Sequence, residues 1–318
     1  MVNYPPPKGK YEALLTIVKV LYDEGPLSPE ELAEKDSVAA FGYSPKDETT
    51  LSPSGSSQAY NELHDVLDVI AENTNQDLRL TRDSEVDDDF LPEPSGRGLA
   101  ELLYDNQSPE IKRATVAAFL LRKLNSYNMS VQSGSIDNAF HTFMETLWDQ
   151  RDNDTGTHRT TWSVDIMVRE LSGAWNTNKA RFVRDRGIDL GVAKREHTNS
   201  GGDNLLPVLS MDIFQTALYY TYQYFLKEMN DESPEFEEFF KTLQQEWYPI
   251  PRSFYDHHIM KRGPLAKDST IDEESYPVLF YHLHQDFPDA ECFTVRYFEA
   301  ETAWSDEITA SEFEIEAN

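Results

Sequence analysis

Two short clusters near the carboxyl-terminal end contain the residue types that bind catalytic metal ions. They are Asp256-His-His258 and His282-Leu-His-Gln-Asp286. Imidazole nitrogens and carboxylate oxygens bind Zn²⁺, Mn²⁺ or Fe²⁺, and a metal ion held in this way can activate water for hydrolysis. The apolar run 278–284 predicts a strand, and the alternation of a strand would place His282 and His284 on the same face.

Each cluster resembles part of the motif of a known metalloenzyme family. The second resembles the first half of the His-x-His-x-Asp-His motif of metallo-β-lactamases, but Phe287 stands at its last position and no histidine follows. The first is similar to the Asp-His-His signature of the DHH phosphoesterases, but no β-branched run precedes it and the other acidic motifs of that family are missing. Because short motifs often match by chance, we expect no metal ligand and no catalytic residue here.

Other sequence patterns typical of enzymes are missing. The chain has no Gly-x4-Gly-Lys-Ser/Thr phosphate loop, no Gly-x-Gly-x-x-Gly turn after a strand and no Gly-x-Ser-x-Gly elbow. The single cysteine, Cys292, excludes an internal disulfide and a multi-cysteine zinc site. Its nearest basic neighbour is Arg296, so we expect a structural thiol. The sequence therefore favours a protein without enzymatic activity or cofactor.

The segment from Gly156 to His197 carries an excess of positive charge in a strongly acidic chain. The whole chain has 28 Lys and Arg residues against 57 Asp and Glu residues, a formal charge of −29. This segment holds eight basic residues against five acidic ones. Phosphate contacts made by Lys and Arg supply most of the non-specific affinity of proteins for nucleic acids. The local excess therefore predicts where this chain would bind a polyanion.

The same segment has the pattern of two helices followed by a hairpin. Apolar spacing and end signals predict helix 164–171, a break at 172–173, helix 178–186 capped by Asn176 or Thr177 and ended by Gly187, and strands 188–194 and 205–209 around the tip 199–203. On the second helix, Arg181, Arg184 and Asp185 would lie on one side. Phe182 and Val183 are then left to pack inward.

This order of helix, turn, basic helix and hairpin resembles the winged-helix and helix-turn-helix family of DNA-binding proteins. The resemblance implies that the second helix contacts the major groove of double-stranded DNA and that the hairpin acts as the wing. The residues expected to bind nucleic acid are Lys179, Arg181, Arg184, Arg186, Lys194, Arg195 and His197. The rival explanation is that these cations neutralise acids in neighbouring parts of the chain and bind no nucleic acid.

The first 98 residues are a partial match to the same family. The predicted elements are helices 11–24, 28–41 and 57–72, a polar loop 42–56 and a short strand 78–82. Three helices followed by a strand is the winged-helix order. However, about fifteen residues separate the second and third helices, where a helix-turn-helix uses three or four. A small helical bundle for protein contacts explains this segment equally well.

The complete pattern predicts a mainly α fold with small β-hairpins, of the α+β class. We expect three domains: a winged-helix-like module at 1–98 with a linker at 83–98, a helical region with the second winged-helix-like module at 99–210, and an aromatic-rich helical domain at 211–318. Other predicted helices are 112–124, 136–150, 211–226 and one starting at 233. The last domain would end in a hairpin of strands 278–284 and 292–299, with frayed residues at 305–318. Helix 211–226 is apolar nearly all round, so we expect burial instead of base stacking.

The charge also indicates the surroundings in which the chain works. This composition resembles that of proteins from halophilic archaea. At about 1 M salt the Debye length falls to ~3 Å, so the repulsion between surface carboxylates is largely screened. No apolar run approaches the ~18 residues of a membrane span, and the first residues lack the features of a signal peptide, so we expect a cytoplasmic protein.

Three functions remain open, in order of preference. The first is a non-enzymatic protein that binds double-stranded DNA, as a regulator of transcription or an accessory subunit of a mobile-element or defence system. The second is a protein-interaction scaffold, a homodimer or a subunit of a larger complex, that binds no DNA. The third is a metal-dependent phosphoesterase or nuclease that would use the histidines and aspartates at 256–258 and 282–286.

Overall fold

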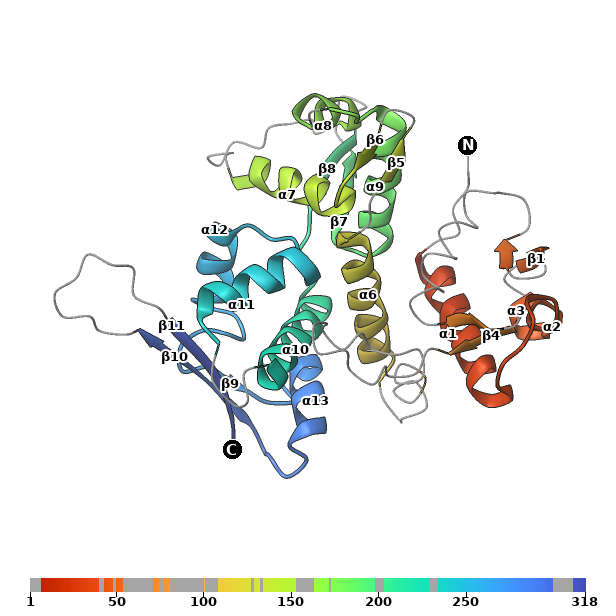
Figure 1. Cartoon of the computed structure of the whole chain (residues 1–318). Coiled ribbons are helices and arrows are strands. Elements are labelled where there is room, and N and C mark those ends of the chain that lie inside the picture. The colour runs from red at the N-terminus through yellow and green to blue at the C-terminus, as the bar shows by residue number, and fades with distance from the viewer. Residues whose placement is uncertain are drawn as a thin grey trace. The chain divides into compact units, whose positions relative to one another are not determined.

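The computed structural model is mostly helical, with several small antiparallel sheets (Figure 1). It describes residues 7–39, 43–47, 50–53, 71–74, 77–80, 100, 108–126, 129–131, 134–152, 163–171, 173–197, 203–228, 234–299 and 311–318. This content confirms the predicted α+β class. The chain divides into two compact units, Met1–Val116 and Ala117–Asn318. The predicted division into three domains stays a prediction.

The described part of the first unit begins with three helices, and the start of the second follows from a local sequence signal. Its elements are α1 Pro7–Glu24, α2 Pro29–Glu34, α3 Asp36–Ala39, β1 Tyr43–Asp47, β2 Thr50–Pro53, β3 Ala71–Thr74 and β4 Asp77–Leu80. Ser28 caps α2, because its Oγ accepts a hydrogen bond from the Glu31 N–H at 3.2 Å while Glu31 Oε2 accepts one from the Ser28 N–H at 2.9 Å. Ile17, Leu32 and Val38 are fully buried between these helices.

Three predictions for this unit need correction or fall, in whole or in part, outside the described residues. The segment predicted as a polar loop forms the antiparallel hairpin β1–β2, with Tyr43 opposite Pro53. A two-stranded ladder tolerates proline because both strands are edges. Of the predicted helix 57–72, residues 57–70 lie outside the described part, and Ala71 already begins β3. β4 pairs with β3 and confirms the predicted strand through Leu80, whereas the predicted linker 83–98 lies outside the described residues.

Helix α6, Pro109–Asn125, contains the boundary between the two units, and the elements that follow it belong to the second unit. They are β5 Met129–Val131, β6 Gly134–Ile136, α7 Ala139–Asp152, α8 Val164–Glu170, α9 Thr177–Asp189, β7 Ala193–His197, β8 Asp203–Pro207, α10 Met211–Glu228, α11 Phe236–Thr242, η1 Leu243–Trp247, α12 Arg252–Phe254, η2 Tyr255–Ile259, β9 Thr270–Ile271, α13 Pro277–Asp286, β10 Phe293–Glu299 and β11 Ser311–Ala317. The helices predicted at 112–124 and 211–226 are thereby confirmed, and the helix predicted at 136–150 begins later, at Ala139, because Ile136 lies in β6.

Helix α10 is the central element of the aromatic core, as its apolar circumference predicts. Phe214 and Leu218 are buried, and the Tyr222 hydroxyl donates to the Ile315 carbonyl at 3.1 Å. The Gln215 Oε1 atom accepts the Leu279 N–H at 3.0 Å, which joins α10 to α13. Phe214 and Tyr222 of α10 therefore pack inside the chain, and the buried Tyr222 hydroxyl has an internal partner.

The prediction of a carboxyl-terminal hairpin is wrong for the first of its two strands, 278–284, and correct for the second, 292–299. Residues 277–286 form helix α13, because Val278, Leu279 and Leu283 together with His282 are spaced to bury one helical face. Strand β10 pairs instead with β11 on one side and β9 on the other. The residues expected to fray from 311 onward form β11, since Phe313 and Ile315 alternate with glutamates and turn to the core.

None of the helices in the described ranges combines the length and the apolar character that crossing a bilayer would require.

Candidate nucleic-acid interface

The elements from α7 to β8 pack into one local assembly (Figure 1). Helix α7 contacts α8, α9 and β8, and α9 also contacts β7. Strands β7 and β8 are antiparallel, with Ala193 opposite Pro207 and His197 opposite Asp203. The predicted order of helix, turn, helix and hairpin is therefore present. Residues 198–202, which include most of the predicted tip, lie outside the described residues.

Helix α9 begins where the sequence predicts and ends later. The Asn176 side chain accepts hydrogen bonds from the N–H groups of Asn178 and Lys179, at 3.1 and 3.0 Å, which confirms the predicted cap. Gly187 does not end the helix. Instead Gly191 turns the chain with φ +77°, and residues 188–189 of the first predicted strand remain helical.

Two hydrogen bonds explain why the helix ends at this later glycine. The Val192 N–H donates to the Gly187 carbonyl at 2.9 Å, and the Gly191 N–H donates to the Ile188 carbonyl at 3.0 Å. This pair of bonds is the Schellman motif, which needs a residue of positive φ after the helix. Gly187 instead provides close packing, because a Cβ atom there would lie 3.2 Å from the Ala193 Cβ and 3.4 Å from the Met144 Sδ.

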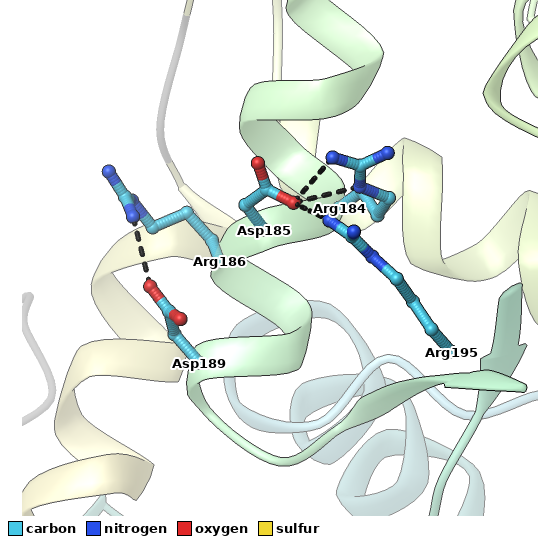
Figure 2. A network of polar contacts seen from close by, with 5 residues as sticks. All are labelled: Arg184, Asp185, Arg186, Asp189 and Arg195. Atoms are coloured by element: carbon cyan, nitrogen blue, oxygen red, sulfur yellow. Dashed lines mark hydrogen bonds and ion pairs between the residues drawn. The ribbon is translucent and has the colours of Figure 1, made fainter. Parts of the chain in front are cut away.

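The basic side chains of α9 and β7 meet carboxylates from their own helix and hairpin. In Figure 2, Arg184 and Arg195 reach the same oxygen of Asp185. Arg184 Nη2 and Nε lie 2.7 and 2.8 Å from Asp185 Oδ1, and Arg195 Nη2 lies 2.6 Å from it. The exposed fractions of these side chains are 16% for Arg184, 23% for Asp185 and 39% for Arg195.

Arg186 faces away from solvent. Its side chain is 9% exposed, and Nη1 lies 3.2 Å from Asp189 Oδ2, one helical turn further on (Figure 2). Its guanidinium also lies 4.9 Å from the centre of the Phe182 ring. Phe182 itself is half-buried, whereas Val183 is fully buried as predicted. A buried and internally paired guanidinium is unsuited to a phosphate contact, so Arg186 belongs to the structure of this helix.

The remaining predicted contacts differ in exposure. Lys179 is half-buried, and its Nζ donates to the Ala174 carbonyl, which closes the turn before α9. Lys194 is exposed, with Nζ 2.5 Å from Glu196 Oε1 on the same strand. Arg181 is exposed, and within the described residues its side chain has no hydrogen bond or ion pair. The His197 backbone lies in β7, and its side chain is outside the described part.

The rival explanation, that these cations neutralise acids in neighbouring parts of the chain and bind no nucleic acid, stays a prediction. Asp185, Asp189 and Glu196 neutralise some of the charge, and they come from α9 and β7 themselves. Residues 177–197 nevertheless contain six Lys and Arg residues and only three acidic ones. The pair of Lys194 and Glu196 is exposed on both sides, so it is weak, and the three acids together reduce the local positive potential without removing it.

The candidate metal ligands are not brought together. Within the described residues, no group of three or more His, Cys, Asp or Glu side chains could hold a metal ion. His282 is buried in the core beside Thr216, while His257 and His258 are exposed on η2. Asp256 Oδ1 accepts from Arg252 Nε at 2.7 Å. Because α13 is a helix and not a strand, His282 and His284 also point from different faces.

Sequence analysis did not find the role of Asp185 as a shared partner. The spacing of Arg186 and Asp189 at i and i+3 does signal their pairing. No local spacing signals the contact between Asp185 and Arg195, since it depends on how β7 folds back along α9. Comparison with models of known protein families, with curated proteins and with solved structures found no match.

Proposed function

We propose that the segment from α7 to β8 binds double-stranded DNA as a winged-helix module. In this proposal α9 meets the major groove and the hairpin β7–β8 contacts the adjacent phosphates. The order of the elements and their mutual packing support this function. The protein would act without catalysis, as a regulator of transcription or an accessory subunit of a mobile-element or defence system.

The observation that carries the proposal is a set of cations that remain exposed after internal pairing. These are Arg181 on α9 and Lys194 and Arg195 on β7, in a chain whose net charge is −29. Each can neutralise one phosphate and release a counterion, which makes the binding constant depend on salt. Lys179 and Arg184 are less exposed and would contribute less, and Arg186 is left out of the proposed contacts.

The scaffold alternative has less support from the described residues. It expects aromatic side chains of the carboxyl-terminal region to pack against another subunit. In the described part of the chain, however, Tyr22 and Phe287 are the large hydrophobic side chains that reach 38% exposure, and the aromatic residues of α10 pack internally. The scaffold function is therefore kept as the alternative that one result of the test below would support.

The test measures binding of a labelled DNA duplex by fluorescence anisotropy over a range of KCl concentrations. Three phosphate contacts predict that the logarithm of the association constant falls with the logarithm of salt with a slope of about −3. The double variant Arg181→Glu/Lys194→Glu should weaken binding more than tenfold and flatten the slope by about two. Neither side chain is buried, so circular dichroism should report an unchanged fold.

A matched control reverses the same number of charges elsewhere. Arg262 and Lys267 are exposed residues between η2 and β9, outside the proposed module. Arg262→Glu/Lys267→Glu changes the total charge equally and should leave most of the affinity intact. Equal losses in the two double variants would assign the binding to overall charge and contradict the proposed site. Absence of duplex binding by the unmodified protein at every salt concentration would exclude the function and favour the scaffold.

A further inference from the structure

Asp185 occupies an unusual place for an acidic residue in a proposed DNA-binding surface. Its Oδ1 atom accepts hydrogen bonds from two arginines, one on its own helix and one on the hairpin strand β7 (Figure 2). A carboxylate that faces DNA alone would repel the phosphates. Between two guanidinium groups it instead leaves a local charge of one positive unit, so the trio as a whole still attracts an anion.

The contacts among Arg184, Asp185 and Arg195 also hold Arg195, the more exposed of the two arginines, in one conformation. Arg195 uses Nη2 for the contact with Asp185, and within the described residues its other nitrogens bind no further side chain. A guanidinium has five N–H donors in a fixed plane, so the remaining donors can take a phosphate oxygen. Because the side chain is already held in one conformation, binding costs less conformational freedom than for a solvated arginine.

The contact further connects the two elements that the proposed function uses. Asp185 lies on α9 and Arg195 lies on β7, ten residues later. A phosphate bound by Arg195 would therefore lie at a defined distance from α9. The Arg184 side chain, which is 16% exposed, adds a second positive charge beside Asp185. Such alignment matters because phosphate contacts determine the register of a protein on the duplex.

We infer that Asp185 is a positioning residue that orients Arg195, backed by Arg184, as a phosphate-binding group. This inference rests on the proposed function, since it names how that site holds the DNA backbone. It makes a prediction that opposes simple electrostatics. If Asp185 acts only through its charge, its neutralisation strengthens binding to a polyanion. If Asp185 positions Arg195, its neutralisation weakens binding.

The experiment measures duplex affinity by anisotropy for the full-length chain and four variants at one KCl concentration. Asp185→Asn should weaken binding about 3- to 10-fold, the range expected when one ordered side chain becomes mobile. Asp185→Glu keeps the carboxylate and should restore the affinity to within about twofold. Glu196→Gln removes an equal charge beside Lys194, and binding should stay equal or become tighter.

Arg195→Lys gives a second measurement that does not alter Asp185. It keeps the positive charge but loses the planar fork, so it should weaken binding to a similar degree as Asp185→Asn. Thermal unfolding of each variant confirms that the fold is retained. Equal or tighter binding by Asp185→Asn would overturn the inference while leaving the proposed function intact. No duplex binding by the unmodified chain would overturn both the proposed function and the inference about Asp185. A loss of affinity in Arg181→Glu/Lys194→Glu without any loss in Asp185→Asn and Arg195→Lys would overturn the inference alone.

Discussion

The rings of Tyr219 and His282 stack in the core with their centroids 4.9 Å apart and their planes inclined by 19°. Tyr219 comes from α10 and His282 from α13, so the stack joins these two helices. The Tyr219 hydroxyl also donates to Asp286 Oδ2 at 2.9 Å, and His282 Nε2 lies 3.4 Å from Thr216 Oγ1. The cluster is therefore a polar connection inside an otherwise aromatic core.

Burial of His282 predicts that acid destabilises this unit. Desolvation lowers the pKa of His282 from its usual 6.5 to about 3. Between these values the unfolded chain binds a proton that the folded chain does not, so stability falls as the pH falls below 6.5. From pH 7 to pH 5 this histidine alone should cost about 2 kcal/mol of the free energy of unfolding.

Urea unfolding of His282→Gln at both pH values measures this contribution. The variant should be less stable at pH 7, because a buried contact changes, but it should lose about 2 kcal/mol less than the parent between pH 7 and pH 5. His257→Gln alters an exposed histidine and should keep the pH dependence of the parent. An identical pH dependence in His282→Gln and the parent would contradict the assignment.

The cap of α9 predicts a local loss of stability. Asn176→Ala removes the acceptor for two N–H groups at the start of the helix and should lower the free energy of unfolding by about 1 kcal/mol. Asn178→Ala, two residues later at an exposed position, should have no such effect. Chemical denaturation of both variants makes the comparison. Equal stability of the two would show that the cap contributes nothing.

The end of α9 makes a separate prediction. Gly191 has φ +77°, and alanine in this left-handed region costs about 1–2 kcal/mol. Gly191→Ala should therefore destabilise the unit by about that amount, and Gly191→Asn should cost less, because asparagine tolerates this conformation better. Thermal or urea unfolding measures both. A loss in Gly191→Asn as large as that in Gly191→Ala would argue against backbone conformation as the cause.

The net charge of −29 predicts stabilisation by salt that reaches a plateau. Screening shortens the Debye length from ~10 Å at about 0.1 M to ~3 Å at about 1 M, so most of the repulsion is removed within this range. The thermal midpoint should rise steeply up to about 1 M KCl and little beyond it. A midpoint that continues to rise linearly above this concentration would indicate exclusion of salt from the surface as the main cause.

The sequence predicts correctly those features that depend on neighbours within a few residues. The capping box at Ser28, the Asn176 cap and the apolar spacing of α7 and α10 are local patterns, and each produced the expected helix. The hairpin β7–β8 also follows from adjacent segments, although Gly191 and not Gly187 ends the helix before it. Either glycine could end a helix, and the two are distinguished in the folded chain by the positive φ of Gly191 and by the close packing of Gly187 against Ala193.

Other features depend on residues that meet only in the folded chain. The apolar run 278–284 suits a strand or a helix, and its packing against α10 decides for the helix. Strand β10 then pairs with β11. The glutamates of β11 make this segment look acidic and exposed in the sequence, but they alternate with Phe313 and Ile315, which are buried. In the same way, composition alone determined that residues 156–197 are rich in cations. Tertiary structure decided which of them turn inward, as Arg186 does, and which reach solvent, as Arg181 and Arg195 do, because exposure depends on where neighbouring elements lie.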